Sequence, residues 1–531
     1  FTCRTVREGR AAGGCVETVI MRTRLFAGAA ATMTALTVAV AVPAAATGSA
    51  SSDEPRDRAT SFNLGVEAKD YSNVLERQAT YLSPANQLQL RTVGQQNTLA
   101  AVMTELHDPQ REFMSDLCWN GYDGCAGDTR LYDWETKGYG IVRPFVFTAR
   151  NGAQLSGHVW ATRSGPAKRP GVVITDGSVQ ADEQMYWFAA QALAKDGYVV
   201  MTFDPQGQGQ SDTLGQGADT LEGVPAQTDG RPFFDGTEDA VNFFLSTPSH
   251  PYRPVASCSS GTSHAAYQTS RVKAGFDAAY NPFWSILNRN EIGLAGHSYG
   301  AAAVSYIAQW DKRIKAVVAW DNLGAPEVAG GESEKGCVDA AARRTAPIHV
   351  PGLGMSADYG LPPTPHTSLP NYDGKDTESL AYSKAGVDSG EIVIRGGSHL
   401  DFSYIPNPAF GASLRGPDIV AWYTNAWFDY YLKHDASGYA HLVSRRWQHD
   451  ALEASVDSFH DGNAFSFYYR SRLDIHEPDG GRFDCEDLRA GCAGMTNHDG
   501  YRGVWSYVNV DTMKDGPATH PVPKGTGIYP T

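Results

Sequence analysis

The sequence predicts an α/β protein whose core is a mostly parallel sheet flanked by helices, spanning roughly residues 138–440. Two observations support this fold class. From Pro170 onward, short segments of strand length alternate with segments of helical length. The short segments are apolar throughout, which is typical of strands covered by helices on both faces of a parallel sheet. The expected fold therefore has an α/β core with an N-terminal helical extension and a C-terminal extension.

The order of the expected elements follows from the same pattern. Two strands, Gly140–Thr148 and Leu155–Thr162, flank a turn at residues 150–152 and open the domain. Further strands are expected at Val172–Thr175, Tyr198–Phe203, Ile292–Ala295, Ile314–Trp320, Ile348–Met355 and Glu391–Ile394. Helices are expected at Gln184–Lys195, Gly236–Leu245, Ala301–Trp310 and Asp418–Lys433.

The N-terminal segments predict export. Residues 1–20 precede Met21 and are expected to be upstream translation. Residues 21–46 combine a basic start, a long uncharged apolar stretch and a small-residue cleavage site at Ala44-x-Ala46, which indicates a secretory signal peptide. Residues 47–60 are expected to form a disordered lead. The protein is therefore expected to be secreted, without a membrane anchor after cleavage.

Three further segments extend or interrupt the predicted domain. Residues 61–137 predict an N-terminal helical extension, with helices at Tyr71–Leu82 and Gln87–Leu106. A Pro/Ser/Gly-rich stretch at residues 246–290 is interpreted as an insertion or lid. Residues 441–531 form a C-terminal extension with one expected strand, at 465–469.

Composition excludes some classes of partner. The chain has 44 basic and 59 acidic residues, a formal charge of −15, which argues against nucleic-acid binding and against a basic membrane-surface mode. Two of the eight cysteines lie before the cleavage site, which leaves six, and an exported protein is expected to pair them. No CxxC motif or Cys/His cluster predicts a metal site. Loop spacing suggests Cys118–Cys125 and Cys485–Cys492, and elimination leaves Cys258–Cys337.

The motif that best indicates chemistry is Gly296-His297-Ser298-Tyr299-Gly300, the one full match to G-x-S-x-G in the chain. An expected strand precedes it and an expected helix follows it, which is the context of a nucleophile elbow. Ser298 is therefore the candidate nucleophile. A serine hydroxyl needs a general base, and His399 follows an expected strand and loop in the position where such a base belongs. His297, inside the elbow, is expected to point away from the reacting atoms.

Two aspartates compete for the third place in the catalytic triad. Asp358 and Asp321 each follow an expected strand, and both lie between Ser298 and His399 in the chain. We favour Asp358, which follows the later strand, and keep Asp321 as the alternative. Asp401 is too close in sequence to His399 to orient its imidazole easily.

The reaction also needs hydrogen-bond donors for the oxyanion. Position in the chain assigns this role to the backbone N–H groups of Ser178 and Tyr299. Trp187, Trp320 and Asp321 are expected to contribute to the substrate pocket.

With these motifs the chain resembles the α/β-hydrolase superfamily. Within it, residues 138–440 are similar to the bacterial secreted cutinase/polyester-hydrolase and dienelactone-hydrolase-like groups. Asp176-Gly177 stands where such proteins usually have His-Gly, and the insertion at 246–290 is long. The segments that carry the resemblance are Val172–Ser178, Gly296–Gly300, Pro347–Asp358, Gly396–His399 and the helix around Trp422 and Trp427.

Together these features predict a carboxylic-ester hydrolase, a serine esterase that works through Ser298, His399 and Asp358 and needs no metal or other cofactor. Its expected partner is a small-molecule or polymeric ester, and the resemblance alone extends this to polyesters and aromatic esters. Two alternatives are a secreted peptidase or amidase on the same triad, and a non-catalytic binding protein on a hydrolase scaffold.

Overall fold

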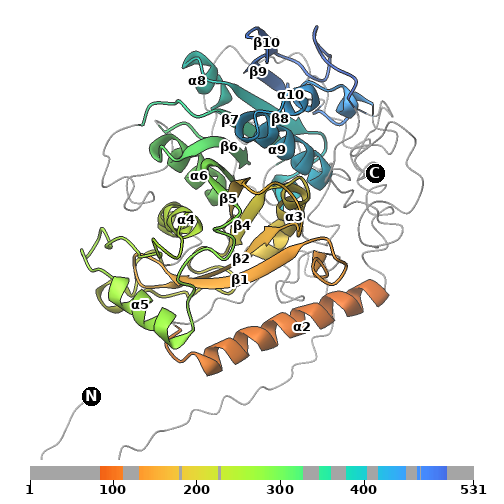
Figure 1. The fold of residues 1–531 in the computed structure, drawn as a ribbon. Helices are drawn as coiled ribbons and strands as arrows, with labels where there is room; N and C mark the ends of the chain where they lie inside the picture. Colours follow the sequence, from red (N-terminus) through yellow and green to blue (C-terminus); the bar gives the residue numbers. More distant parts are fainter. Residues whose placement is uncertain are drawn as a thin grey trace, which may run out of the picture. The chain divides into compact units, whose positions relative to one another are not determined.

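One sheet of ten strands organises the part of the chain that the computed structural model describes (Figure 1). The structure describes residues 84–111, 131–178, 182–224, 229–326, 346–359, 378–403, 416–449, 463–466 and 468–498. The strand order is β1-β2-β4-β3-β5-β6-β7-β8-β9-β10. The strands are β1 Ile141–Thr148, β2 Gln154–Ala161, β3 Arg169–Thr175, β4 Val199–Phe203, β5 Leu287–His297, β6 Ile314–Trp320, β7 Gly352–Ala357, β8 Ser389–Ile394, β9 Arg472–His476 and β10 Arg482–Cys485.

The six central strands, from β4 through β3 to β8, pair in parallel. The strands at both sides, β1–β2 and β9–β10, pair antiparallel. Parallel strands place their carboxyl ends at one edge of the sheet, so the loops that follow β3, β5, β6, β7 and β8 gather there. The predicted α/β fold class with a mostly parallel sheet is confirmed.

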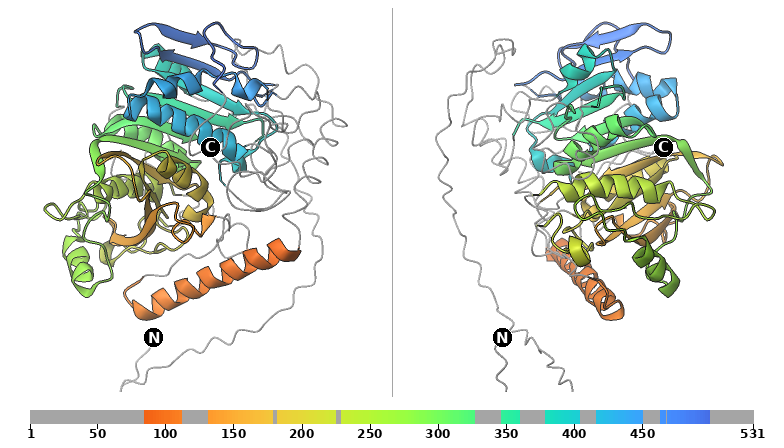
Figure 2. Two further views of the ribbon diagram at one scale, coloured as in Figure 1. Left: turned by 45° about the vertical axis from the view of Figure 1, so that its right-hand side comes forward. Right: turned by 90° about the vertical axis from the view of Figure 1, so that its left-hand side faces the viewer.

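Helices cover both faces of this sheet (Figure 2). Side chains along β3 alternate between the two sides, because Val172 and Ile174 join the apolar cluster under α3 and α9, whereas Val173 joins the cluster under α4 and α6. The α-helices within the described residues are α2 Pro84–His107, α3 Trp187–Lys195, α4 Arg231–Phe244, α5 Ala265–Ala274, α6 Tyr299–Trp310, α8 Ser379–Lys384, α9 Gly416–Leu432 and α10 Ala436–Leu442.

Two expected strands differ from the structure. Phe465 makes an isolated bridge to Ile394, and the described residues of the segment 465–469 form no strand. The C-terminal extension instead adds β9 and β10 to the free edge of β8. These two strands are short and rich in charged residues, so they depend on edge pairing and lack the apolar run that predicts a buried strand. The strand expected from Ile348 begins only at Gly352, after Pro351, whose backbone nitrogen has no hydrogen to donate.

The extensions are described in part. α2 confirms the expected helix at 87–106, whereas the helix expected at 71–82, the signal peptide at 21–46 and residues 1–20 and 47–60 lie outside the described residues. The Cys485–Cys492 disulfide is present. Cys258 is also in a disulfide, whose partner lies outside the described residues, as do Cys118, Cys125 and Cys337. Of the helices described, none combines the length and the apolar character needed to cross a membrane.

Candidate active site

The turn at Ser298 is sharp. β5 ends at His297 and α6 begins at Tyr299, so Ser298 alone connects the strand to the helix. Its backbone, at φ 57° and ψ −120°, lies outside the regions that L residues ordinarily adopt. Such strain in a residue other than glycine is typical of functional turns.

Close packing explains both glycines of the motif. A Cβ atom on Gly296 would lie 2.5 Å from the carbonyl oxygen of Gly300, far inside van der Waals distance. A Cβ atom on Gly300 would collide with the backbone carbonyl oxygens of Thr175 and Asp176. The elbow therefore packs directly against the loop that follows β3, where the oxyanion donor is expected.

His399 lies on a short loop after β8. A single 3₁₀ turn, His399–Phe402, begins there, and the Ser398 N–H donates a hydrogen bond to the Asp401 carboxylate at 2.6 Å. The Leu400 N–H in turn donates to the Ser398 hydroxyl at 3.3 Å. Asp401 therefore binds the backbone of this loop, which fixes the position of His399.

The carboxylate beside His399 is that of Asp321. His399 Nδ1 lies 2.5 Å from Asp321 Oδ2, and the two side chains are 15% and 8% exposed. Asp321 directly follows β6, the neighbour of β5, and its N–H donates to the carbonyl of Met355 at 2.8 Å. Because a carboxylate accepts a hydrogen bond from the Nδ1–H group, the Nε2 atom of a neutral His399 is left as an acceptor. This is the arrangement that a general base for Ser298 requires.

The structure corrects the preference for Asp358. Asp358 Oδ2 accepts the Gly396 N–H at 2.8 Å, and Oδ1 accepts the hydroxyl of Ser466. Asp358 follows β7, so it holds the turn that leads from β8 toward His399, whereas the imidazole reaches across to the end of β6. The alternative acid, Asp321, is the one in contact with His399.

The loop after β3 lies against the nucleophile. A Cβ atom on Gly177 would lie 3.3 Å from the Cβ of Ser298. The backbone N–H of the next residue, Ser178, has no hydrogen-bond partner among the described residues. Tyr299, whose N–H is the other expected donor, begins α6 directly after Ser298. Both predicted donor positions therefore border the nucleophile.

The two tryptophans expected in the substrate pocket belong to the apolar core. Trp320 is fully buried, and its indole N–H donates to Thr424 at 3.1 Å. Trp187 is 7% exposed and packs against Trp160 and Tyr132, at ring distances of 4.9 and 4.8 Å. Both side chains thus stabilise the contact between the sheet and its helices.

Buried carboxyl groups lie behind the loop after β3. Asp176 is fully buried, and neither of its oxygens has a hydrogen-bond donor in the described part of the chain. Burial and the nearby Asp204 raise the pKa of Asp176 well above its usual range, and burial together with Glu183 raises the pKa of Asp204 to about 7. Asp176 and Asp204 can bind each other only while one of them carries a proton.

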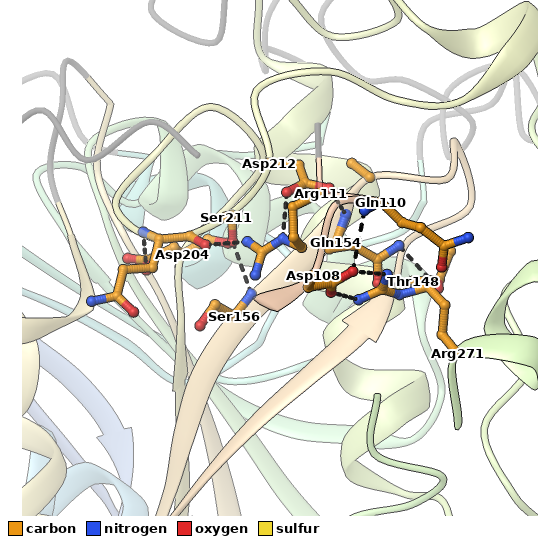
Figure 3. A network of polar contacts seen from close by, with 12 residues as sticks. Asp108, Gln110, Arg111, Thr148, Gln154, Ser156, Asp204, Ser211, Asp212 and Arg271 are labelled. Atoms are coloured by element: carbon orange, nitrogen blue, oxygen red, sulfur yellow. Dashed lines mark hydrogen bonds and ion pairs between the residues drawn. The ribbon is translucent and has the colours of Figure 1, made fainter. Parts of the chain in front are cut away.

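A polar network connects the segment after α2 to this region (Figure 3). Arg111 binds Asp212 at 2.6 Å and the Gln210 carbonyl at 2.5 Å, and the charged pair is almost completely buried. The Gln210 N–H donates to Asp204 at 2.9 Å, and the same carboxylate accepts the Glu183 N–H at 2.8 Å. The N-terminal extension therefore helps to fix the loop after β4 and, through it, the far end of the loop after β3.

The insertion is attached to the same extension. Arg271 on α5 is fully buried and pairs with Asp108 at 2.5 Å (Figure 3). It also pairs with Asp277 at 2.8 Å. Asp277 also accepts the hydroxyl of Thr148, at the end of β1, at 2.9 Å. Buried ion pairs of this kind fix α5, which lies within the segment 246–290, against the end of β1 and the residues after α2.

Among the described residues, one group of side chains has the spacing of metal ligands. Glu222, Asp235 and Cys258 place ligand atoms within 4.8 Å of one another. Cys258 is in a disulfide, so its sulfur offers no thiolate to a metal ion. This group gives no support for a metal centre.

Comparison of the chain with protein-family models and with curated proteins gave no match.

Proposed function

We propose that this protein is a serine hydrolase of the α/β-hydrolase fold that cleaves carboxylic esters through Ser298, His399 and Asp321. The observation that carries the proposal is the contact of 2.5 Å between His399 Nδ1 and Asp321 Oδ2, at the sheet edge where Ser298 occupies a strained turn. These residues come from the ends of β8, β6 and β5, so the fold brings together three segments that are far apart in sequence.

The geometry supports a two-step acyl transfer. Ser298 Oγ attacks the ester carbonyl while His399 Nε2 accepts its proton, and Asp321 stabilises the imidazolium that forms. The N–H groups of Ser178 and Tyr299 stabilise the oxyanion of the tetrahedral intermediate. His399 then gives the proton to the leaving alkoxide oxygen, which departs as the alcohol and leaves an acyl-enzyme. Water attacks the acyl-enzyme by the same route, releases the carboxylic acid and restores the Ser298 hydroxyl.

The topology supports the α/β-hydrolase assignment. Eight strands in the order β1-β2-β4-β3-β5-β6-β7-β8, with only the second antiparallel to its neighbours, precede the two added strands. The nucleophile follows the central strand β5, and the base follows β8.

Secretion belongs to the same proposal. Disulfides persist in oxidising compartments and are rare in the cytosol. Cys485 and Cys492 are paired, and Cys258 is in a second disulfide. Together with the signal-peptide pattern at residues 21–46, these bonds support an extracellular enzyme.

The test is hydrolysis of p-nitrophenyl esters with acyl chains from acetyl to palmitoyl. We expect turnover by the native protein and its loss in Ser298→Ala, and the preferred chain length measures the acyl pocket. Labelling of Ser298 by a fluorophosphonate probe tests the nucleophile separately. Turnover of aminoacyl p-nitroanilides in place of esters would show a peptidase or amidase, and no labelling and no turnover would favour a binding protein.

A further inference from the structure

The residue before the nucleophile contacts two other parts of the site. His297 is 3% exposed, and its Nε2 atom lies 2.8 Å from the backbone carbonyl oxygen of His399. Its Nδ1 atom lies 2.8 Å from the hydroxyl of Tyr186. The same hydroxyl lies 3.0 Å from the N–H of Gly177, in the loop that borders Ser298.

The direction of each hydrogen bond follows from the chemistry of the groups. A carbonyl oxygen only accepts, so His297 Nε2 carries a hydrogen and donates to His399. In a neutral imidazole Nδ1 is then an acceptor, so the Tyr186 hydroxyl donates to it. The Tyr186 oxygen in turn accepts the N–H of Gly177. The three bonds form one continuous chain from the loop after β3 to the backbone of the base.

The electrostatics favour this neutral arrangement. Burial, with a smaller contribution from His399, lowers the pKa of His297 well below its usual range. Burial also raises the pKa of Tyr186 well above its usual range, so the phenol keeps its hydrogen. Each group therefore has a single hydrogen-bonding state over the pH range in which an esterase works.

Packing restricts movement of the chain of hydrogen bonds. Tyr186 is fully buried, and its ring is nearly parallel to that of Trp320, at 7° and a centroid distance of 6.3 Å. Trp320 is the residue before Asp321, and its backbone carbonyl accepts the N–H of Ser298 at 3.0 Å. The Tyr186–His297 pair thus contacts segments that carry the proposed oxyanion donor, nucleophile, base and acid.

We propose that Tyr186 and His297 are positioning residues that hold the base His399 and the loop with the Ser178 donor in register with Ser298. The inference rests on the proposed esterase function. Neither side chain is proposed to exchange a proton with substrate. They act on the backbone of two loops whose placement decides how well the reacting groups align.

Three variants test the pair. Tyr186→Phe removes one hydroxyl at nearly constant volume, His297→Phe removes both ring nitrogens, and His297→Gln keeps an amide that can donate to the His399 carbonyl. Tyr252→Phe is the matched control, because Tyr252 is also buried and donates to a backbone carbonyl, that of Thr148, at 3.0 Å, outside this site. The readouts are kcat and KM for a p-nitrophenyl ester, with kcat expressed per serine labelled by a fluorophosphonate probe.

Misplacing catalytic groups by about 1 Å costs about 100-fold in rate, so we expect Tyr186→Phe and His297→Phe to lower kcat about 10- to 100-fold. KM should change little, His297→Gln should recover much of the loss, and Tyr252→Phe should match the native enzyme. The double variant Tyr186→Phe/His297→Phe should be little worse than the worse single variant, because both changes break one chain. If His297→Phe does not fold, Tyr186→Phe alone decides, by the same change in kcat per labelled serine.

A kcat per labelled serine within about twofold of native in Tyr186→Phe and His297→Phe would overturn the positioning role and leave the esterase proposal intact. A merely structural role would lower thermal stability in these variants and leave kcat per labelled serine unchanged. Failure of the esterase proposal itself would appear differently, as ester turnover that survives in Ser298→Ala or as no turnover in the native protein.

Discussion

The carboxyl ends of β6 and β7 differ, although an aspartate directly follows each strand. Asp321 gives one oxygen to His399 Nδ1, and its other oxygen has no hydrogen-bond partner among the described residues. Asp358 accepts a hydrogen bond on each oxygen, from the N–H of Gly396 and the hydroxyl of Ser466. A carboxylate occupied by fixed donors stabilises the fold, whereas one that holds an imidazole can stabilise the charge that develops on it during a reaction.

The ends of β3 and β4 extend the comparison. Asp176 follows β3 and Asp204 follows β4, and both are buried carboxyl groups with raised pKa values. Asp204 accepts two backbone N–H groups, whereas Asp176 accepts none among the described residues. Four aspartates in equivalent sequence positions thus have three different roles, which are set by the donors around them.

The largest effect is expected from a substitution that removes the contact between His399 and Asp321, at the end of β6. His399→Ala should lower kcat/KM for p-nitrophenyl esters by about 10⁴-fold or more, because Ser298 loses its general base. His349→Ala, which removes an exposed histidine near the start of β7, is the control and should leave kcat/KM unchanged. Near-native turnover by His399→Ala would contradict the triad.

A smaller effect is expected on the pH dependence of stability, through the buried carboxyl groups of Asp176 and Asp204. A carboxyl group with a raised pKa in the folded state binds more protons folded than unfolded, so its contribution to stability falls as pH rises from about 4 to the folded value, about 7 for Asp204. Asp176→Asn replaces one of the two titrating carboxyl groups, Asp176 and Asp204, with a neutral amide. Relative to the native protein, its free energy of unfolding should therefore rise by about 2 kcal/mol between pH 5 and pH 8.

Urea unfolding at several pH values measures this difference. Asp479→Asn, on the exposed turn between β9 and β10, is the control and should follow the native curve. Parallel curves for Asp176→Asn and the native protein would show that the pair does not titrate in this range.

The smallest effect concerns the end of β7. Ser466→Ala removes one of the two donors to Asp358, so the free energy of unfolding should fall by about 1–3 kcal/mol while kcat per labelled serine stays within a few-fold of native. Chemical denaturation and active-site titration measure the two quantities. A large loss of kcat per labelled serine without a loss of stability would place Asp358 in the reaction.

Local pattern was sufficient for the central sheet and for the elements that carry two residues of the candidate site. The apolar strands and the motif around Ser298 are strong signals because each depends on neighbours in sequence, and His399 could be placed from the strand and loop before it. The acid could not, because Asp321 and Asp358 both follow a strand between the same two residues. Strand order and the positions of Gly396 and Ser466 separate them, and those are properties of the folded chain.

The surroundings of Trp187 and Trp320, the strands of the C-terminal extension and the role of His297 were hard to predict, because each depends on contacts that form only in the folded chain. Trp187 and Trp320 lie close in sequence to site residues, but they face the core between sheet and helices. β9 and β10 carry charged residues and depend on edge pairing, β9 with β8 and β10 with β9. The role of His297 depends on Tyr186, which lies 111 positions away in sequence.

The most direct test of the account is kcat/KM of Asp321→Asn beside Asp358→Asn, each measured per mole of folded protein. An amide in place of the Asp321 carboxylate no longer stabilises the imidazolium and favours the wrong tautomer, so Asp321→Asn should lose about 10⁴-fold. Asp358→Asn should stay within about tenfold of native and lose stability instead, since its donors hold the backbone before His399. The reverse pattern, with Asp358→Asn inactive and Asp321→Asn near native, would contradict the assignment of Asp321 as the catalytic acid.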